Sequence, residues 1–383
     1  MIAPGRETSP SAKLVIPSDV VAGHDSIEEY TQDVYDRIGP LLEDIHLDVN
    51  QPPDYVVGGR LYKSDDVPVS QRLLDDAITK LSTAARERLA ETGDADGRFR
   101  LKVAKTNEAD PQRHQTVRVH AAMYDEGHGI TLRIQPSIVP AFADTDLPDR
   151  LLEHLNRDRG LFVFAGPVAS GKTVAAHSML RHLNESVLAL PKHILCIEDP
   201  PEFDHIPIRA KFRVREIGIS APNYVSALAG AMRIRPDHIF LGELRSRDEI
   251  KAAVLGASLA LPVTTTLHAD TSLEALDRLI SSFDGNERAE VLAALQGNLA
   301  GIVALKRIPS TTGGMITAYE ILLNTPATRD GFKDPISLRG ALDQQENMNT
   351  LETCLMNYHK LGRITKETAI RYAPDTSRLH FDA

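Results

Sequence analysis

The sequence predicts an α/β protein made of two units, and two patterns carry that prediction. From residue 151 onward, apolar runs of strand length alternate with helical patterns, which is typical of a parallel sheet covered by helices. Upstream, helical patterns flank short alternating strands, which indicates a compact α+β unit. The downstream runs are continuously apolar, as expected for strands buried on both faces, and they cover Leu161–Ala165, Ile194–Ile197, Ile239–Leu241 and Val263–Leu267.

The first part of the chain is expected to contain a flexible arm and one small domain. Residues 1–25 are rich in Pro, Ser and small residues without a period, so we expect a flexible N-terminal arm. Within a domain over residues 26–140, apolar spacing predicts a helix from Ser26 to about Pro40 and an amphipathic helix over residues 70–91. Short strands are expected around residues 45–49, 55–57, 99–103 and 117–119.

The second unit is expected to begin after a short linker. Residues 141–149 are polar and contain a proline, which favours a linker. Residues 150–383 then form the domain with the parallel sheet. From about residue 285 the pattern becomes mostly helical, and the helix candidates are residues 289–305, 336–342, 351–361 and 366–372.

Composition and charge exclude several classes of protein. An apolar share of 42% can fill hydrophobic cores, and a formal net charge of −10 argues against a general nucleic-acid binder. Cys196 and Cys354 are the 2 cysteines and lie far apart, which excludes a disulfide framework or a cysteine-rich zinc site and favours a reducing compartment. Because no stretch approaches the length of an apolar membrane span, we expect no transmembrane segment and only partner-mediated association with a membrane.

The strongest local signal is a glycine-rich segment that fits G-x-x-x-x-G-K-[ST] directly after the apolar run Leu161–Ala165. In such a loop, backbone N–H groups turn toward phosphates, Lys172 adds positive charge at the β- and γ-oxygens, and Thr173 offers its hydroxyl to Mg²⁺. The alternative is a chance glycine-rich turn, which the strand-loop-helix context disfavours. The segment therefore predicts an ATP-binding loop formed by Gly166, Pro167, Val168, Ala169, Ser170, Gly171, Lys172 and Thr173.

Acidic residues and a histidine follow three other strands of the predicted sheet. Glu198 ends the run before Asp199-Pro200-Pro201-Glu202, Glu243 follows the run that ends at Leu241, and His268 follows Leu267. The carboxyl ends of parallel strands are where ligands of open α/β sheets bind. Each of the three could instead be an ordinary surface or structural residue. Beside a phosphate loop, the carboxylates are candidates for placing the metal and activating water, and His268 for sensing the γ-phosphate.

In chain order, four motifs resemble those of the type II/IV secretion system ATPase superfamily. They are the Walker A segment, the aspartate box Ile197-Glu198-Asp199-Pro200-Pro201-Glu202-Phe203, the Walker B segment Leu241-Gly242-Glu243-Leu244-Arg245 and the histidine box Thr266-Leu267-His268-Ala269. Asp44-Ile45-His46-Leu47 and Gly97-Arg98-Phe99-Arg100 are similar to segments of that family's PAS-like N-terminal domain. The resemblance covers about residues 26–375 and implies a P-loop, RecA-like C-terminal domain.

The resemblance also implies a homohexamer in which ATP lies at a subunit boundary, between the two domains. Arginines of the N-terminal domain reach the phosphates there in that family, and Arg100 and Arg133 stand at the matching positions. Arg98 and Arg118 are weaker candidates, and an exposed surface arginine is the alternative for each of them. A guanidinium supplied by a mobile domain would link phosphoryl transfer to domain rotation.

Two departures of this sequence from the patterns of related ATPases narrow the choice of subfamily. Residues 327–332 lose the aliphatic positions of the pilus-retraction arm, and 2 cysteines cannot form the four-cysteine zinc module of type II secretion ATPases. The chain therefore resembles most the DotB/TraJ-like ATPases of type IVB secretion and conjugation. The alternatives are a PilT-like pilus-retraction ATPase and, from another class, a nucleic-acid translocase or a regulatory nucleotide-binding adaptor.

The resulting hypothesis is an ATP- and Mg²⁺-dependent hydrolase that powers substrate transfer or pilus dynamics. Thr173 and Glu243 are the expected metal-holding residues, and Glu198 and Glu243 share metal placement and water activation without a division of roles between them. The expected partners are other copies of the chain and inner-membrane platform proteins, with no sequence-specific nucleic acid. The expected location is the cytoplasm, peripherally at the bacterial inner membrane.

Overall fold

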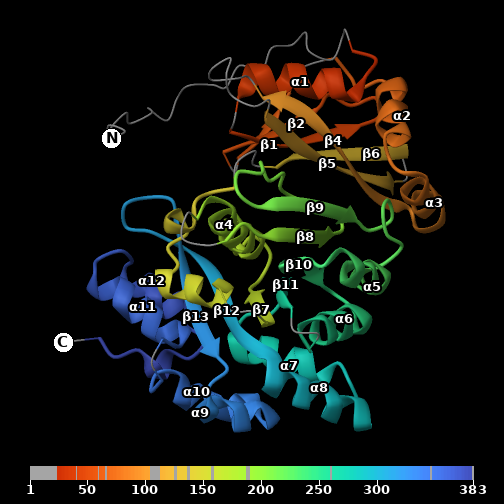
Figure 1. The fold of residues 1–383 in the computed structure, drawn as a ribbon. Coiled ribbons are helices and arrows are strands. Elements are labelled where there is room, and N and C mark those ends of the chain that lie inside the picture. Colours follow the sequence, from red (N-terminus) through yellow and green to blue (C-terminus); the bar gives the residue numbers. More distant parts are fainter. Residues whose placement is uncertain are drawn as a thin grey trace. The chain divides into compact units, whose positions relative to one another are not determined.

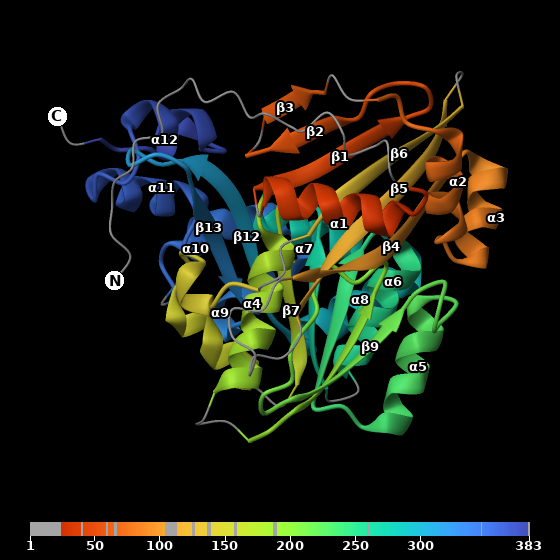
Figure 2. The same cartoon turned by 90° about the horizontal axis from the view of Figure 1, so that it is seen from above.

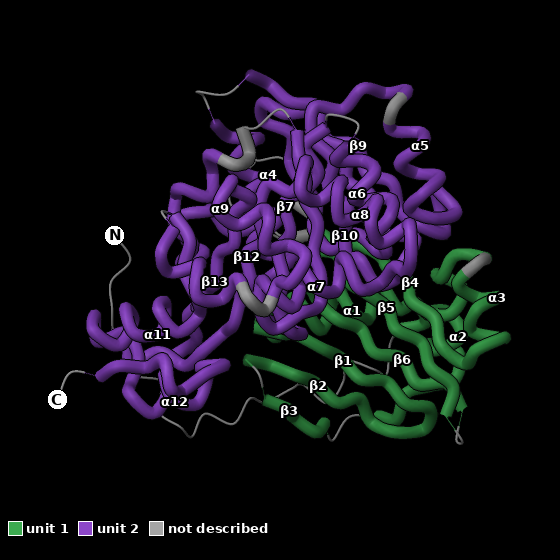
Figure 3. The backbone as a smooth tube through the Cα atoms, turned by 90° about the horizontal axis from the view of Figure 1, so that it is seen from below, with its two compact units in different colours: residues 1–137 green, residues 138–383 purple. Residues whose placement is uncertain are grey.

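The computed structural model describes residues 24–381, apart from residues 40, 59, 65–66, 104–112, 125–126, 136–138, 157–158, 187–189, 259–260 and 346. Most of the expected N-terminal arm, residues 1–23, therefore lies outside the described residues. The chain divides into two compact units, residues 1–137 and residues 138–383 (Figure 3). Each unit has its own hydrophobic core.

Unit 1 is a six-stranded sheet with helices on one face (Figure 2). The strand order is β3-β2-β1-β6-β5-β4, and every neighbouring pair is antiparallel. The strands are β1 (Leu42–Asp48), β2 (Asp54–Val57), β3 (Arg60–Lys63), β4 (Asp94–Val103), β5 (Arg113–Tyr124) and β6 (Gly127–Ile134). The helices are α1 (Ile27–Ile38), α2 (Gln71–Thr79) and α3 (Thr83–Thr92).

Local sequence explains where these helices begin and end. The helix expected to end near Pro40 stops at Ile38, before Gly39 with φ +86°. The single helix expected over residues 70–91 is wrong, because the structure has two helices there. The Ser82 hydroxyl accepts a hydrogen bond from the Ala85 amide at 3.1 Å and starts α3, so an N-cap interrupts the apolar period.

Unit 2 is built on a seven-stranded sheet of order β13-β12-β7-β11-β10-β8-β9. All neighbouring pairs are parallel except the hairpin β12–β13. The strands are β7 (Gly160–Ala165), β8 (His193–Glu198), β9 (Lys211–Glu216), β10 (His238–Leu244), β11 (Pro262–Leu267), β12 (Leu299–Pro309) and β13 (Met315–Leu323). The expected α/β class with a parallel sheet is thereby confirmed.

Helices cover both faces of this sheet. Figure 1 shows α4 (Lys172–Glu185) on one side and α5 (Tyr224–Ile234), α6 (Arg247–Ser258) and α8 (Gly285–Asn298) on the other. The central strands β7 and β11 are buried at every position, which explains their continuous apolar pattern. The remaining helices are α7 (Ser272–Ser281), α9 (Pro326–Arg329), α10 (Arg339–Leu342), α11 (Leu351–Lys360) and α12 (Lys366–Tyr372).

The mostly helical tract expected from residue 285 is corrected by the structure. The expected helix over residues 289–305 ends at Asn298, and the chain continues as β12 and β13. Residues 299–305 are all buried, and an entirely apolar run of this length does not distinguish a strand from a buried helix. A side chain at Gly301 would lie 3.0 Å from the Leu322 carbonyl oxygen, so this glycine lets the hairpin partner approach closely.

The segment expected as a linker, residues 141–149, belongs to unit 2. It contains a 3-10 turn at Phe142–Asp144, and the side chains of Phe142 and Leu147 join the core of unit 2. The division between the units falls upstream of this segment, at residues 137 and 138.

Candidate functional site

The glycine-rich loop connects the buried strand β7 to helix α4. Gly166 has φ +152°, and a side chain there would lie 2.6 Å from the Leu305 carbonyl oxygen and even closer to the Ser170 hydroxyl. Gly171 has φ +91° and precedes the first helical residue, Lys172. Glycine is therefore required at the first position by space and favoured at the second by backbone conformation, so that the loop wraps tightly around the start of the helix.

Two polar side chains of this loop are turned inward. Lys172 is buried, and its Nζ donates to the Pro167 carbonyl oxygen at 3.2 Å. Burial lowers the pKa of Lys172, while Glu243 and Glu202 act in the opposite direction. Ser170 is 2% exposed, and within the described part of the chain its hydroxyl has no hydrogen-bond partner. A buried hydroxyl without a partner in a loop of this shape suits a polar ligand.

The sheet brings the predicted residues to one edge. Strands β7, β11, β10 and β8 are neighbours and parallel, with Ala165 opposite Leu267, and Leu267 opposite Leu244. The loop after β7, His268 after β11, Glu243 near the end of β10 and Glu198 at the end of β8 consequently share the carboxyl edge of the sheet.

Glu243 is the centre of a group of charged and polar side chains. Its Oε1 lies 2.9 Å from His268 Nε2 and 3.9 Å from Lys172 Nζ, and its Oε2 accepts from Arg245 Nε at 2.8 Å. Burial and the neighbouring Lys172 lower the pKa of His268, which favours the neutral imidazole near neutral pH. Two other predicted residues, Lys172 and His268, therefore both lie beside the Glu243 carboxylate.

Glu198 lies on the adjacent strand in a different environment. Its side chain is 4% exposed, and its Oε2 lies 3.4 Å from His177 Nε2 and 3.4 Å from the Glu202 amide. Gly242, the residue before Glu243 on β10, adjoins Glu198, because a side chain at Gly242 would lie 3.5 Å from Glu198 Cγ. The two predicted carboxylates thus share the same edge but contact different partners.

Sequence reasoning missed two residues of this site. Arg245 was quoted within a motif without a role, although it contacts Glu243. His177 carried no local signal, because it lies in the middle of helix α4 and meets Glu198 only in the folded sheet. A search for charged or imidazole side chains on the helix after a phosphate loop would have found it.

The two predicted arginines lie on the sheet of unit 1. Arg133 on β6 donates to Asp44 through Nε at 2.8 Å and Nη2 at 3.2 Å. Arg100 is exposed on β4, opposite Thr116 of β5. The weaker candidate Arg118 lies opposite Arg98 and contacts Asp96 at 3.3 Å. The roles of these arginines at a phosphate stay predictions.

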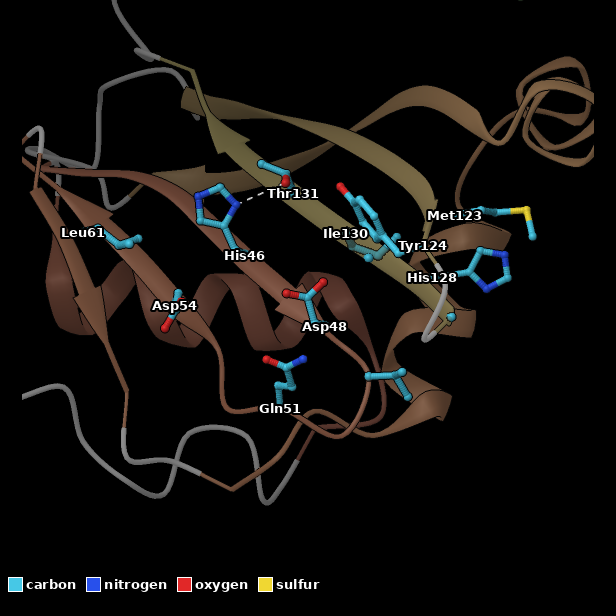
Figure 4. Close-up of a pocket in the computed structure, with 13 residues that line it drawn as sticks. His46, Asp48, Gln51, Asp54, Leu61, Met123, Tyr124, His128, Ile130 and Thr131 are labelled. Carbon is cyan, nitrogen blue, oxygen red and sulfur yellow. Dashed lines mark hydrogen bonds between the residues drawn. The ribbon is translucent and has the colours of Figure 1, made fainter.

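Unit 1 also has an open pocket of about 760 Å³. Residues of β1, β2, β3, β5 and β6 line it, and His46 Nδ1 lies 3.1 Å from Thr131 Oγ1 (Figure 4). His46 belongs to the segment Asp44-Ile45-His46-Leu47 quoted for the family resemblance. None of the predicted site residues is among those that line this pocket.

Two further findings concern metals and membranes. Among the described residues, no group of three or more His, Cys, Asp or Glu side chains is arranged to hold a metal ion. The predicted metal-holding pair lies at the carboxyl edge of the sheet, with Thr173 in the first turn of α4 and Glu243 near the end of β10. In the part of the chain that the structure describes, no helix is both long enough and apolar enough to cross a membrane.

Comparisons with known proteins place the chain in a family. The sequence profile of the family "Type II/IV secretion system protein" matches residues 94–313. The chain is 28% identical over 336 residues to the type IV pilus retraction ATPase PilT of Pseudomonas aeruginosa, covering 85% of this chain and 92% of that protein. It is 29% identical over 341 residues to the uncharacterized protein YggR of Escherichia coli, covering 88% and 96%.

Solved structures agree with the sequence comparisons. The crystal structure of the pilus retraction motor PilT with bound ADP matches with a TM-score of 0.76 at 27% identity, over 88% of this chain and 95% of that chain. The Legionella pneumophila ATPase DotB matches with a TM-score of 0.77 over 89% and 93%, and at 24% identity this likeness concerns the fold alone. Because the family profile covers more than half of the chain, this protein belongs to the type II/IV secretion system protein family.

Proposed function

We propose that this protein is an ATP hydrolase that acts as the motor of a secretion or pilus machine. The observation that carries the proposal is the position of Glu243 between Lys172 of the glycine-rich loop, 3.9 Å away, and His268, 2.9 Å away. Hydrolysis of a nucleoside triphosphate needs cationic and acidic groups at one point beside the γ-phosphate. The names of the relatives PilT and PilU as ATPases support the same activity.

Nucleotide binding is assigned to residues 166–173, acting as the P-loop of a RecA-like domain. The inward Lys172 and the buried Ser170 hydroxyl are suited to phosphate oxygens, and the amides at the start of α4 add a positive dipole. Thr173 and Glu243 would hold Mg²⁺, since a hydroxyl and a carboxylate are the hard oxygen donors that it takes. A Mg²⁺ ion held by these two residues would neutralise negative charge on the phosphates of the nucleotide.

The remaining residues divide the work of hydrolysis. Glu198 and Glu243 share metal placement and water activation, and His268 donates toward the γ-phosphate and reports its presence. Neutral His268 has one N–H, and its Nε2 lies 2.9 Å from Glu243 Oε1, within hydrogen-bond distance. Exchange of this contact for a phosphate contact would release the Glu243 carboxylate, so the nucleotide state changes the hydrogen bonds at this edge.

The assembly proposed is a homohexamer in which the PAS-like unit 1 supplies Arg100 and Arg133 to a phosphate. The bidentate contact of Arg133 with Asp44 orients its guanidinium while leaving 58% of the side chain exposed. Partners would be inner-membrane platform proteins, with the chain on the cytoplasmic side and without sequence-specific nucleic acid binding. The proposal is tested by mass determination with and without a non-hydrolysable ATP analogue, for which only a nucleotide-stabilised hexamer is the supporting outcome.

Two machines are candidates for this motor. A type IVB secretion or conjugation system is favoured by residues 327–332, which lack the aliphatic positions of a retraction arm and form a short helix and a 3-10 turn. A PilT-like retraction motor is favoured by the identity to PilT along most of both chains. Deletion of the gene separates them, because loss of twitching motility indicates retraction and loss of DNA or effector transfer indicates secretion.

The activity itself is tested with purified full-length protein. Lys172→Ala and Glu243→Gln are each expected to lower steady-state ATP turnover by about 100-fold or more, because each removes a charge beside the γ-phosphate. Lys251→Ala and Glu287→Gln are matched controls, since this exposed ion pair joins α6 and α8 at 2.6 Å without contacting the site. Unchanged turnover in Lys172→Ala or Glu243→Gln would refute the assignment. Strong stimulation by single-stranded DNA would instead favour a translocase.

A further inference from the structure

Two histidines of unit 2 form a buried pair beside the site. His177 lies on α4 in the same helix as Lys172, and His205 lies in the segment that follows β8. His177 Nδ1 and His205 Nε2 are 2.8 Å apart. His177 is 0% exposed and its ring packs against the rings of Phe203 and Phe240, while His205 stacks on another phenylalanine, Phe212. The proposed mechanism leaves both imidazoles without a role.

Both rings are neutral at physiological pH. Burial lowers the pKa of His177 to about 4 and lowers the pKa of His205 well below the ordinary value. A neutral imidazole carries one N–H and one bare nitrogen, so the hydrogen bond between the two rings has only two possible directions. The direction decides whether the outer nitrogen of His177, Nε2, carries a proton.

The position of Glu198 favours one of these two directions. His177 Nε2 lies 3.4 Å from Glu198 Oε2, and both side chains are almost completely buried. If His177 Nδ1 carried the proton, the bare Nε2 would face a carboxylate oxygen in a medium of low dielectric constant, which is repulsive. If His205 Nε2–H donates to His177 Nδ1, the proton of His177 is on Nε2 and faces the carboxylate, which is attractive.

The approach of His177 to Glu198 falls short of a formed hydrogen bond. No hydrogen bond reaches His177 Nε2 within the described part of the chain, although the carboxylate oxygen is 3.4 Å away. The same Oε2 accepts from the Glu202 amide, also at 3.4 Å. Two donor positions therefore converge on one oxygen of Glu198.

We propose that His177, held by His205 in the tautomer with its proton on Nε2, is a positioning residue that orients the carboxylate of Glu198. This inference rests on the proposed function, in which Glu198 acts in hydrolysis. His177 belongs to the helix that begins with the phosphate loop, and Glu198 ends a strand on the other side of β10 and β11 in the sheet. The imidazole thus joins the element that binds the triphosphate to the element that carries the carboxylate.

The first test separates kcat from KM. His177→Leu is expected to lower kcat about tenfold with KM for ATP changed less than twofold, because the phosphate loop keeps its contacts while the carboxylate loses its orientation. His177→Gln keeps a donor near the Nε2 position and is expected to recover most of kcat. His205→Phe keeps the stacking on Phe212, removes the donor to His177, and is expected to lower kcat in the same sense.

His238 supplies the matched control. It is also buried, contacts Thr264 Oγ1 at 3.0 Å, and lies at the opposite end of β10 from Glu243. His238→Leu is expected to lower the melting temperature and leave kcat per folded molecule unchanged. An equal loss of kcat in His238→Leu and His177→Leu, or an equal kcat in the Leu and Gln variants of His177, would overturn the positioning role.

The second test reads the tautomer without using activity. Ring nitrogen NMR of the wild-type protein is expected to place the His177 proton on Nε2, with the signal assigned by its loss in His177→Gln. A proton on Nδ1 would overturn the inference. If the wild type hydrolyses ATP no faster than Lys172→Ala, the proposed function and the role of His177 both fail. If the wild type hydrolyses ATP normally and His177→Leu has the same kcat, only the role of His177 fails.

Discussion

The two carboxylates at the edge of the unit 2 sheet differ in their surroundings. Glu243 is 20% exposed and contacts Arg245, His268 and, more distantly, Lys172. Glu198 is 4% exposed and meets the neutral His177 and a backbone amide. Cationic partners make Glu243 sensitive to a charged ligand that competes for them, whereas buried neutral donors can fix the direction of a carboxylate without a change in charge. The comparison favours a metal-holding role for Glu243 and an oriented base for Glu198.

The largest expected effect comes from replacing the two carboxylates one at a time and comparing the changes in turnover and in nucleotide affinity. Glu243→Gln removes the charge that holds Lys172 and Arg245, so we expect kcat to fall about 100-fold or more and affinity for ATP in the presence of Mg²⁺ to fall as well. Glu198→Gln should lower kcat while leaving that affinity within about threefold, because its side chain meets the neutral His177 and the Glu202 amide. Titration with a fluorescent ATP analogue and steady-state kinetics measure both. Equal losses of affinity in the two variants would contradict the division of roles.

The histidine partners of the two carboxylates should differ in their effect on stability. His177→Ala leaves a cavity among buried aromatic rings and is expected to lower the free energy of unfolding by about 2–4 kcal/mol. His268→Ala removes a side chain that is 38% exposed and is expected to cost less than about 1 kcal/mol. Urea unfolding of both variants gives the two values. A smaller loss for His177→Ala than for His268→Ala would show that the buried partner is poorly packed.

Mild acid should lower the stability of the folded protein through its buried histidines. Burial lowers the pKa of His177 to about 4 and of His238 to about 3, both below the ordinary value of 6.5. Below pH 6.5 these two imidazoles bind protons in the unfolded chain but stay neutral in the folded chain. Each histidine therefore contributes stability at pH 7 that is lost as the pH falls toward 4. Below the ordinary pKa of 6.5 and above the lowered pKa, the loss approaches about 1.4 kcal/mol per pH unit for each residue.

The slope is measured by urea unfolding between pH 7 and pH 5. His238→Gln removes one of these buried histidines, so we expect a smaller loss of stability per pH unit than in the wild type. A pH slope that is the same in the wild type and in His238→Gln would mean that His238 titrates normally in the folded protein.

The smallest effect concerns the residue between the two carboxylates. The side chain added by Gly242→Ala would lie 3.2 Å from the Tyr224 hydroxyl, which must move by a few tenths of an ångström, and 3.5 Å from Glu198 Cγ, which is ordinary van der Waals contact. We expect a cost of about 1 kcal/mol or less and a drop in kcat of only a few-fold, measured by the same unfolding and turnover assays. A loss of turnover as large as that of Glu243→Gln would mean that the spacing of the two strands is itself critical.

The α/β class and the parallel sheet could be predicted from sequence because burial on both faces imposes continuous apolar runs at β7, β8, β10 and β11. The edge shared by Lys172, Glu198, Glu243 and His268 also followed from the sequence, since parallel strands end on one side of a sheet. The hairpin β12–β13 did not, because residues 299–305 are apolar at every position and carry no period. The break at Ser82 was missed because an N-cap there acts through one local hydrogen bond that apolar spacing does not detect.

By itself, then, the sequence determined which side chains stand at the ends of strands and that a glycine-rich loop precedes a helix, because these features depend on neighbours along the chain. Only the tertiary structure decided which partner each carboxylate meets. His177 and Glu198 are brought within 3.4 Å by the packing of α4 against the sheet, and His177 and His205 lie 28 positions apart in sequence. Contacts of this kind arise from the order of the strands and the faces of the helices, neither of which is encoded in a local pattern.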